Sequence, residues 1–466
     1  MVFSSLPFLF LFLTVVLLVS HILPFRFRNF FLLLANLVFY AYGEPVYVLI
    51  MIGSILVNFF AGLLMDKQST QGRRRAVLVV GIVLNLAALG VFKYAGLFVS
   101  TLREIPGLSS LPEVDIALPI GISFYTFQAV SYLIDVYWDD CAASHNLINF
   151  ASYISLFPQL IAGPNVRYKD VNEQLVSRRE TPTLFNSGVR LFVVGLAKKV
   201  LLANQFGMLW DAMSADPVAA GALGAWAGAC AYTLQIYFDF AGYSDMARGL
   251  GRMLGFEFCI NFNYPYISKS VTEFWRRWHI SLGKWFRDYV YFPLGGSRVR
   301  TSKILRNLLI VWLLTGIWHG AAWTFVFWGL LHGLAQVLEK FPLRNVREKV
   351  PDWVNWLVTM LIVNFGWVFF AAPSLGSALH WIGQMFYSAA GFLDGTALYY
   401  LGSSWPLLLI AIIGCTPWPK LVGANFAGSK GVGTKVVSVA VYALLLVSCV
   451  ASMINATYST FLYFQF

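Results

Sequence analysis

Charged residues are scarce in this chain of 466 residues. Asp, Glu, Lys and Arg make up 12% of it, whereas 58% of the residues are hydrophobic. Soluble domains carry about a quarter charged residues and roughly half apolar ones. Together with a mean hydropathy of +0.68, this composition excludes an ordinary soluble domain and indicates a polytopic membrane protein.

Cysteines are also few, and their spacing indicates no site. Cys141, Cys230, Cys259, Cys415 and Cys449 are scattered and form no CxxC pair. Neither a disulfide framework nor a metal site is therefore indicated. Linkers rich in Ser or Pro and internal repeats are missing as well. We therefore expect a single integral membrane domain over residues 1–466.

Acidic residues are outnumbered by basic ones, which gives a formal charge of +11. In a soluble chain this charge would suggest nucleic acid, but here it indicates Lys and Arg gathered in cytoplasmic loops, beside lipid and not nucleic acid. The first apolar segment, 3–23, lacks a basic n-region and a cleavage site, so we interpret it as a retained span. Arg26 and Arg28 follow it, and 73–75 follow the third segment. These loops are expected in the cytoplasm, with the N-terminus and the turn at 43–45 outside.

Apolar segments recur along the chain and predict an all-α membrane fold. They lie near residues 3–23, 30–42, 46–65, 76–92, 115–137, 147–163, 189–206, 219–239, 308–332, 354–372, 404–416 and 434–457. A spanning helix needs about 20 apolar residues, so we expect about eleven transmembrane helices with shorter re-entrant or interfacial ones. Residues 240–307 are the least hydrophobic and the most basic, and are expected to form a cytoplasmic or interfacial region of short amphipathic helices.

A histidine lies inside one of these apolar segments. His319 has no carboxylate nearby in sequence, and an ionisable group in hydrocarbon costs free energy, so such a residue is usually functional. A second histidine, His279, lies in a short basic and aromatic stretch at 274–282. The pair predicts proton transfer at membrane depth. For each, the alternative is a structural hydrogen bond to a neighbouring helix. His332 is expected near the far boundary of the segment that contains His319, in a structural role.

Six strings in order resemble a known family. They are Leu118–Gln128, Phe157–Pro164, Tyr237–Asp245, Asn261–Tyr266, Phe274–Leu282 and Trp318–Gly320. Together they resemble the membrane-bound O-acyltransferase family, and within it the alginate O-acetylation branch of bacteria, which residues 1–5 and 461–466 also resemble. The resemblance implies a bowl-like helical fold whose thin centre is reached by tunnels from either side. His319 matches the family's essential histidine, and His279 matches a position that other branches fill with Asn or Asp.

The resemblance also implies a reaction. An acetyl group would pass from a cytoplasmic thioester, expected to be acetyl-CoA, across the bacterial inner membrane for O-acetylation of a secreted polysaccharide such as alginate, with a periplasmic acetyltransferase as partner. Imidazole can take a hydroxyl proton and return it to sulfur, and apolar surroundings would keep His319 neutral and so able to act as the base. His279 is expected to orient the substrate or to donate a hydrogen bond to the oxyanion.

Three alternatives stay open at this point. Cellulose acetylation and D-alanyl transfer to teichoic acid use the same fold, and a transporter would use the histidines as a proton relay. Transporters commonly show internal repeats, which this sequence lacks. The residues do not specify the polymer, the acyl donor or a covalent intermediate.

Several further residues are candidates for binding. Four basic residues suit the phosphates of a nucleotide-bearing donor, and equally anionic lipid headgroups: Arg276, Arg277, Lys284 and Arg287. Tunnel-lining candidates are Gln128, Asp239, Trp278 and Trp318. Asp135 and Asp245 could also line the acceptor path, and Lys198 and Lys199 could anchor phosphate. For these polar side chains, pairing with a neighbouring helix is the alternative. The spacing of Gly316, Gly320, Gly329 and Gly333 indicates close helix contact.

Overall fold

The computed structural model describes residues 1–161, 163–215, 221–389, 391–393, 395–428, 431–455 and 461–462. Across these ranges the regular elements are helices, and no strand forms, which confirms the all-α class. Ala162 and residues 463–466, which belong to two of the strings quoted above, lie outside the described residues. The chain divides into two compact units, one of Met1–Phe192 with Met246–Cys259 and the other of Val193–Asp245 with Ile260–Phe466.

Unit 1 holds the N-terminal helices. They are η1 (Pro7–Phe12), α1 (Leu13–Ile22), α2 (Phe25–Gly43), α3 (Val48–Asp66), α4 (Gln71–Arg103), α5 (Ile122–Tyr137), α6 (Leu147–Ser155), α7 (Phe157–Leu160) and α8 (Tyr168–Val176). The break between α2 and α3 confirms the turn at 43–45. The apolar segment at 115–137 becomes helical only at Ile122, because Pro119 disfavours helix in the residue before it and Gly121 adopts a left-handed conformation with φ of 78°.

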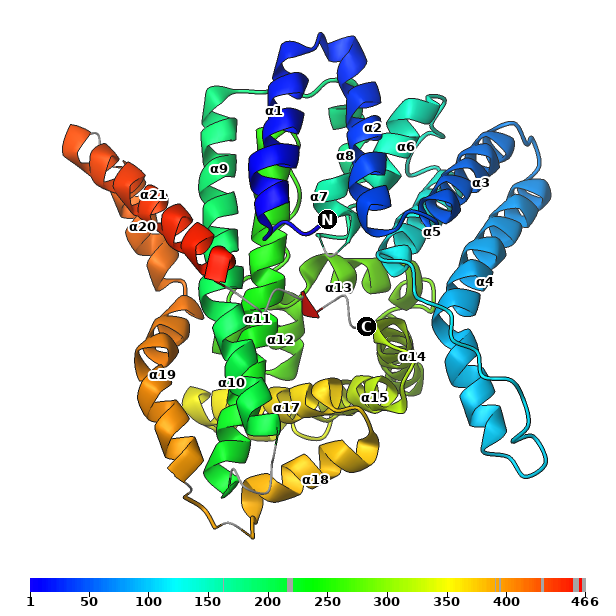
Figure 1. Ribbon diagram of the computed structural model, residues 1–466. Coiled ribbons are helices and arrows are strands. Elements are labelled where there is room, and N and C mark those ends of the chain that lie inside the picture. Colours follow the sequence, from blue (N-terminus) through cyan, green and yellow to red (C-terminus); the bar gives the residue numbers. More distant parts are fainter. Residues whose placement is uncertain are drawn as a thin grey trace. The chain divides into compact units, whose positions relative to one another are not determined.

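Two helices contribute to both units, and the rest belong to unit 2. The shared helices are α9 (Pro182–Ala197) and α11 (Gly221–Met253). Unit 2 continues with η2 (Lys198–Ala203), α10 (Asn204–Ser214), η3 (Pro265–Ile267), α12 (Val271–Arg277), α13 (Ile280–Phe286), η4 (Arg287–Tyr291), α14 (Thr301–His319), α15 (Trp323–Lys340), α16 (Arg344–Lys349), α17 (Asp352–Ala371), α18 (Leu375–Phe386), α19 (Gly395–Gly414), α20 (Trp418–Gly428) and α21 (Val432–Asn455). In Figure 1 the colours follow the order of the chain, and most of these helices are labelled.

Six helical segments within the described residues are long and apolar enough to cross a membrane. They are Val48–Asp66, Gln71–Arg103, Pro182–Ser214, Asp352–Ala371, Gly395–Gly414 and Val432–Asn455. Of the most apolar window of α21, only 6% is buried, and of that of α4 only 17%. Apolar surface exposed to this extent is favourable in contact with lipid and unfavourable in contact with water. The composition and these helices together establish a multi-pass membrane protein, although the predicted number of eleven spans is not confirmed.

Two of the predicted segments whose boundaries differ in the structure bear on the histidines and the basic region. The segment expected at 219–239 continues as α11 to Met253. The first part of the predicted interfacial region 240–307 therefore belongs to this long helix. The segment expected at 308–332 is not one span but the two helices α14 and α15, which meet at residues 320–322. His332 therefore does not lie at the far end of a helix that contains His319. It lies in α15, fully buried, with its ring 5.5 Å from that of Trp312 in α14.

The α14–α15 hairpin packs through the glycines that the sequence singled out. A Cβ atom at Gly329 would overlap the carbonyl oxygen of Trp312, and one at Gly333 would lie 2.9 Å from the Trp312 Cβ. Any larger residue at these positions would force the helix backbones apart. The close contact confirms the interpretation of the glycine spacing, and the two helices lie side by side in Figure 1.

Candidate functional site

His319 is the last residue of α14, where the chain turns back into α15. Gly320 follows in an extended conformation, with φ of −165°. A Cβ at this position would overlap the Phe325 ring, so the tight packing of the turn requires glycine. The turn thus holds the imidazole at a fixed point, at the inner end of the hairpin.

The surroundings of His319 are aromatic. The residue is 6% exposed, and its ring lies 4.8 Å from that of Trp328, 4.9 Å from that of Trp318 and 5.3 Å from that of Phe370, measured between centroids. These rings shield the imidazole from water. An imidazole can accept a proton only in its neutral form.

His279 lies at the junction of α12 and α13 and has an unusual backbone. Its φ of 44° and ψ of 54° are left-handed, which costs free energy in a residue with a Cβ. Backbone hydrogen bonds hold this conformation: the N–H of Ile280 donates to the carbonyl of Asn261 at 2.9 Å, and the N–H of Asn263 donates to that of Arg277, also at 2.9 Å. The segment at 261–263 therefore braces the junction from both sides.

The side chain of His279 is anchored to the same segment. Its Nδ1 lies 3.2 Å from Oδ1 of Asn261, an oxygen that also accepts hydrogen bonds from the backbone N–H and the hydroxyl of Ser281, at 3.1 and 2.9 Å. Nε2 is buried and has no hydrogen-bond partner among the described residues. His279 lies outside the six candidate spans, and burial lowers the pKa of its imidazole to about 3. The ring is therefore neutral at physiological pH.

Trp318 brings the two histidines to one place in unit 2. Its ring lies 6.3 Å from that of His279 and 4.9 Å from that of His319. Trp278, which precedes His279 in sequence, is buried and stacks on Phe274 at 5.5 Å between ring centroids. Residues from α12, α13 and α14 that lie about forty positions apart in sequence thus share one aromatic compartment. Metal-binding groups of three or more His, Cys, Asp or Glu side chains are not found among the residues searched.

The four predicted basic residues fall into two groups. Arg277 pairs with Glu273 at 2.9 Å, and Arg287 pairs with Asp288 at 2.7 Å. Arg276 and Lys284 are exposed, and neither forms an ion pair or hydrogen bond within the part of the chain that the structure describes. Of the four, Arg276 and Lys284 are therefore the better candidates for binding an external anion.

The predicted lining residues lie in different surroundings. Gln128 is buried in α5 of unit 1, and its side-chain oxygen has no hydrogen-bond partner within the described ranges. Asp239 is buried in α11 and pairs with Lys199 at 2.6 Å, while it also accepts from the backbone N–H of Leu462. Ionic pairing with a neighbouring segment, the alternative that the sequence left open, therefore describes Asp239.

The other charged candidates are paired as well. Lys169 contacts Asp135 at 2.8 Å within unit 1, and Lys198 contacts Asp245 at 2.7 Å within unit 2. Both lysines of the 198–199 pair are thus engaged with carboxylates of α11. Whether any of these side chains also lines a substrate path stays a prediction.

Comparison with known proteins identifies the family. A model of MBOAT, the membrane-bound O-acyltransferase family, matches residues 139–378. The chain is 46% identical over 392 residues to the probable alginate O-acetylase AlgI of Pseudomonas aeruginosa. This match covers 83% of this chain and 75% of that protein. The chain belongs to the membrane-bound O-acyltransferase family.

Two further relatives widen the comparison. The probable alginate O-acetylase AlgI of Pseudomonas putida is 41% identical over 488 residues and covers 100% of both chains. The peptidoglycan O-acetyltransferase of Helicobacter pylori is 35% identical over 388 residues, which is 76% of this chain and 72% of that protein. As a membrane-bound O-acyltransferase, the chain is an enzyme that transfers an acyl group to a hydroxyl.

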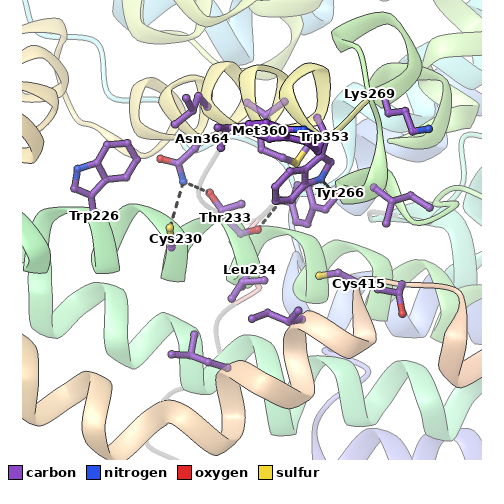
Figure 2. A pocket seen from close by; sticks show the side chains of 18 of the residues that line it. Trp226, Cys230, Thr233, Leu234, Tyr266, Lys269, Trp353, Met360, Asn364 and Cys415 are labelled. Atoms are coloured by element: carbon purple, nitrogen blue, oxygen red, sulfur yellow. Dashed lines mark hydrogen bonds between the residues drawn. The ribbon is translucent and has the colours of Figure 1, made fainter. Parts of the chain in front are cut away.

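One cavity of this acyltransferase lies away from the histidines. It has a volume of about 690 Å³ and is lined mainly by apolar residues of α11, α17 and α19, with Thr233 and Asn364 as neighbouring polar groups (Figure 2). The amide nitrogen of Asn364 donates to the Thr233 hydroxyl at 2.8 Å. Neither His279 nor His319 lines this cavity.

Sequence reasoning missed the residues that hold His279 in place. Asn261 was recognised only as part of the string Asn261–Tyr266, and Ser281 and Ser244 received no role. Ser244 accepts a hydrogen bond from the Asn261 amide at 3.2 Å. The place of Asn261 at the start of that string was the only signal in the sequence, and its contact with His279, 18 positions away, becomes visible only in the folded chain.

Proposed function

We propose that this membrane-bound O-acyltransferase passes acetyl groups from a cytoplasmic thioester donor, acetyl-CoA, across the bacterial inner membrane for O-acetylation of a secreted polysaccharide such as alginate. The observation that carries the proposal is the compartment in which His319 and His279 share Trp318. In this proposal His319 is the general base.

The names of the relatives support acetyl as the transferred group. Alginate O-acetylases and a peptidoglycan O-acetyltransferase differ in polymer but share the acetyl group. A teichoic acid D-alanyltransferase of Streptococcus thermophilus matches over only 48% of this chain, at 32% identity. The wider coverage by O-acetyltransferases favours acetyl over D-alanyl, and the alginate relatives favour alginate among the polymers.

The proposed reaction has two steps, the attack on the thioester and the departure of the thiol. The acceptor oxygen attacks the thioester carbonyl carbon while His319 takes the hydroxyl proton. The tetrahedral intermediate then collapses, the carbon–sulfur bond breaks, and the proton moves from the imidazolium to the leaving thiolate. A buried imidazole is suited to both steps, because the aromatic walls exclude competing water.

The donor would be held by Arg276 and Lys284. Both residues are exposed near the His279 junction, and acetyl-CoA carries several phosphate charges that Arg and Lys bind. Anionic lipid headgroups would satisfy the same side chains. Competition between acetyl-CoA and anionic lipid for this region is therefore part of the proposal. On the outer side, the acceptor would be a periplasmic acetyltransferase that modifies the polymer.

The transporter alternative finds no support. Inverted repeats and paired broken helices are the usual signs of a secondary transporter, and the sequence contains no internal repeat. The family match also makes acyl transfer the primary activity.

The test is acetyl transfer by a His319→Ala variant. Cells expressing wild-type protein, His319→Ala or the control His380→Ala, a change at an exposed position in α18, are compared for polymer acetyl content. Purified proteins in proteoliposomes are compared for consumption of radiolabelled acetyl-CoA. We expect His319→Ala to insert normally and to lose at least about 100-fold in rate, the lower end for general-base catalysis. Near-normal acetyl content in this variant would disprove the catalytic role.

A further inference from the structure

The hydrogen bonds around Asn261 define which of its side-chain atoms is the oxygen. A backbone N–H can only donate, and the N–H of Ser281 points at the Asn261 atom 3.1 Å away. That atom must therefore be the carbonyl oxygen and not the amide nitrogen. The nitrogen then faces the Ser244 hydroxyl at 3.2 Å, which can accept. The orientation of this amide follows from chemistry and not from an arbitrary choice.

The same oxygen determines the proton position on His279. Oδ1 of Asn261 lies 3.2 Å from Nδ1 of His279, and a carbonyl oxygen offers only lone pairs. Nδ1 must therefore carry the proton to make a hydrogen bond, and in a neutral imidazole Nε2 then carries a lone pair. Nε2 is buried and has no protein partner among the described residues.

We infer that Asn261 is a positioning residue that holds His279 in the Nδ1–H tautomer, so that Nε2 receives a hydrogen bond from an O–H or N–H of the substrate. The inference rests on the proposed function for the identity of that substrate. Of the two roles expected from sequence, it favours orientation of the substrate, because a lone pair cannot donate a hydrogen bond to an oxyanion. His279 thus orients a substrate donor group, and the oxyanion must find its hydrogen bonds elsewhere.

Burial increases the energetic effect of these hydrogen bonds. Asn261 and His279 are each 1% exposed, so water cannot replace a missing partner. An unsatisfied buried nitrogen costs free energy, which a substrate hydroxyl or the amide N–H of a pantetheine arm would recover on binding. The fixed tautomer makes the site selective for a group that donates a hydrogen bond. The same logic operates wherever a second side chain sets the tautomer of a catalytic histidine.

The variants are chosen around one matched pair. Asn261→Leu removes the acceptor at nearly constant volume, and Asn261→Asp keeps an acceptor with a negative charge. Asn263→Leu is the control, since Asn263 lies in the same segment, is exposed, and forms only backbone hydrogen bonds among the described residues. Elution on size exclusion in detergent verifies that each variant is folded.

The first readout is the tautomer, measured by nitrogen-15 NMR of labelled histidine. This measurement does not depend on acetyl transfer, so all variants are made in a His319→Ala background. The signal of His279 is assigned by its disappearance in His279→Asn. We expect His279 in the Nδ1–H form when position 261 is Asn or Asp, and also in the Asn263→Leu control. In Asn261→Leu we expect a mixture of the two tautomers. An Nε2–H form in the protein with Asn261 intact would overturn the inference.

The second readout is acetyl transfer from acetyl-CoA in proteins with His319 intact. We expect Asn261→Leu to lose about 10-fold in kcat/KM, the loss expected for one hydrogen bond that holds His279 in place. Asn261→Asp should retain activity with the acid limb of its pH profile moved to higher pH, because a carboxylate stabilises the imidazolium. A rise in KM for acetyl-CoA identifies the donor's amide as the group bound to Nε2, and a fall in kcat alone identifies the acceptor hydroxyl. Equal activity in Asn261→Leu and Asn263→Leu would contradict the inference.

The two proposals fail in different ways. If wild-type protein shows the Nδ1–H tautomer but transfers no acetyl group, the proposed function is wrong and the positioning by Asn261 stands. If acetyl transfer is normal but the tautomer is Nε2–H, the proposed function stands and the positioning is wrong.

Discussion

At the residue scale, two histidines in one compartment have separable tasks. His319 is wrapped by aromatic rings at the end of α14, whereas His279 is tied by its Nδ1 to an amide. The first environment suits a residue that gains and loses a proton. The second suits a residue that keeps one proton in place and offers a lone pair to the substrate.

Asparagine substitutions separate these tasks. His279→Asn should keep partial activity, because an amide oxygen can still accept a hydrogen bond from the substrate. His319→Asn should keep none, because an amide cannot take a proton at neutral pH. Both variants are assayed for acetyl transfer and for polymer acetyl content. Equal and complete loss in both would mean that His279 also exchanges a proton.

Sequence could predict the two histidines but not their neighbours. His319 stood out because an imidazole in an apolar segment is costly, a signal that needs no structure. Asn261 carries no such signal, since an asparagine beside aromatic residues is common in loops. Its function depends on contact with His279 and Ser281, at sequence separations of 18 and 20.

At the element scale, a half-buried glutamate positions the helix that leads to His279. Glu339 in α15 accepts hydrogen bonds at the start of α12 from the N–H of Val271 at 2.6 Å and from the N–H and hydroxyl of Thr272, each at 3.1 Å. A carboxylate at a helix N-terminus satisfies donors that have no partner within the helix. The hairpin that holds His319 thus also fixes α12, and Glu339 couples the two.

Removal of this carboxylate should loosen α12. Glu339→Ala leaves three donors without their acceptor, each worth about 1 kcal/mol net and more where burial prevents hydration. We expect a lower unfolding temperature in detergent together with reduced acetyl transfer, and a smaller effect in Glu339→Gln, which keeps one oxygen. Glu348→Ala is the control, because its ion pair with Arg344 is exposed on both sides and such pairs contribute little. An unfolding temperature in Glu339→Ala equal to that of the control would refute the coupling.

Some helix boundaries cannot be predicted from a hydropathy pattern. The composition of 308–332 is apolar throughout, so a hydropathy pattern merges α14 and α15 into one span. The break at 320–322 depends on Gly320 packing under Phe325, a contact within the hairpin that no local average contains. By contrast, the turn at 43–45 has glycine and proline in sequence and was predictable.

At the scale of the whole molecule, charge asymmetry predicts the topology. Contacts inside unit 1 agree with it. A Cβ at Gly43 would lie 3.4 Å from the Met1 nitrogen, so the N-terminus and the α2–α3 turn share one end. The loop after α5 pairs with the opposite end of α3 and α4, through Arg74 and Asp139 at 2.6 Å and through His145 and Asp66 at 3.3 Å. The basic end should be cytoplasmic.

Cysteine accessibility tests this topology and with it the cross-membrane reaction. Single cysteines are placed at Gly43, Gln71 and Ser302, all exposed, in a background without other cysteines, and are labelled with a membrane-impermeant maleimide. Only Gly43→Cys should react in intact cells, because the segments 67–75 and 269–306 are basic and are expected inside. Gln71→Cys and Ser302→Cys should react after permeabilisation, which also controls for intrinsic reactivity. Reaction of Ser302→Cys from outside would put Arg276 and Lys284 on the wrong face for cytoplasmic acetyl-CoA, and transfer from the cytoplasm would have to be abandoned.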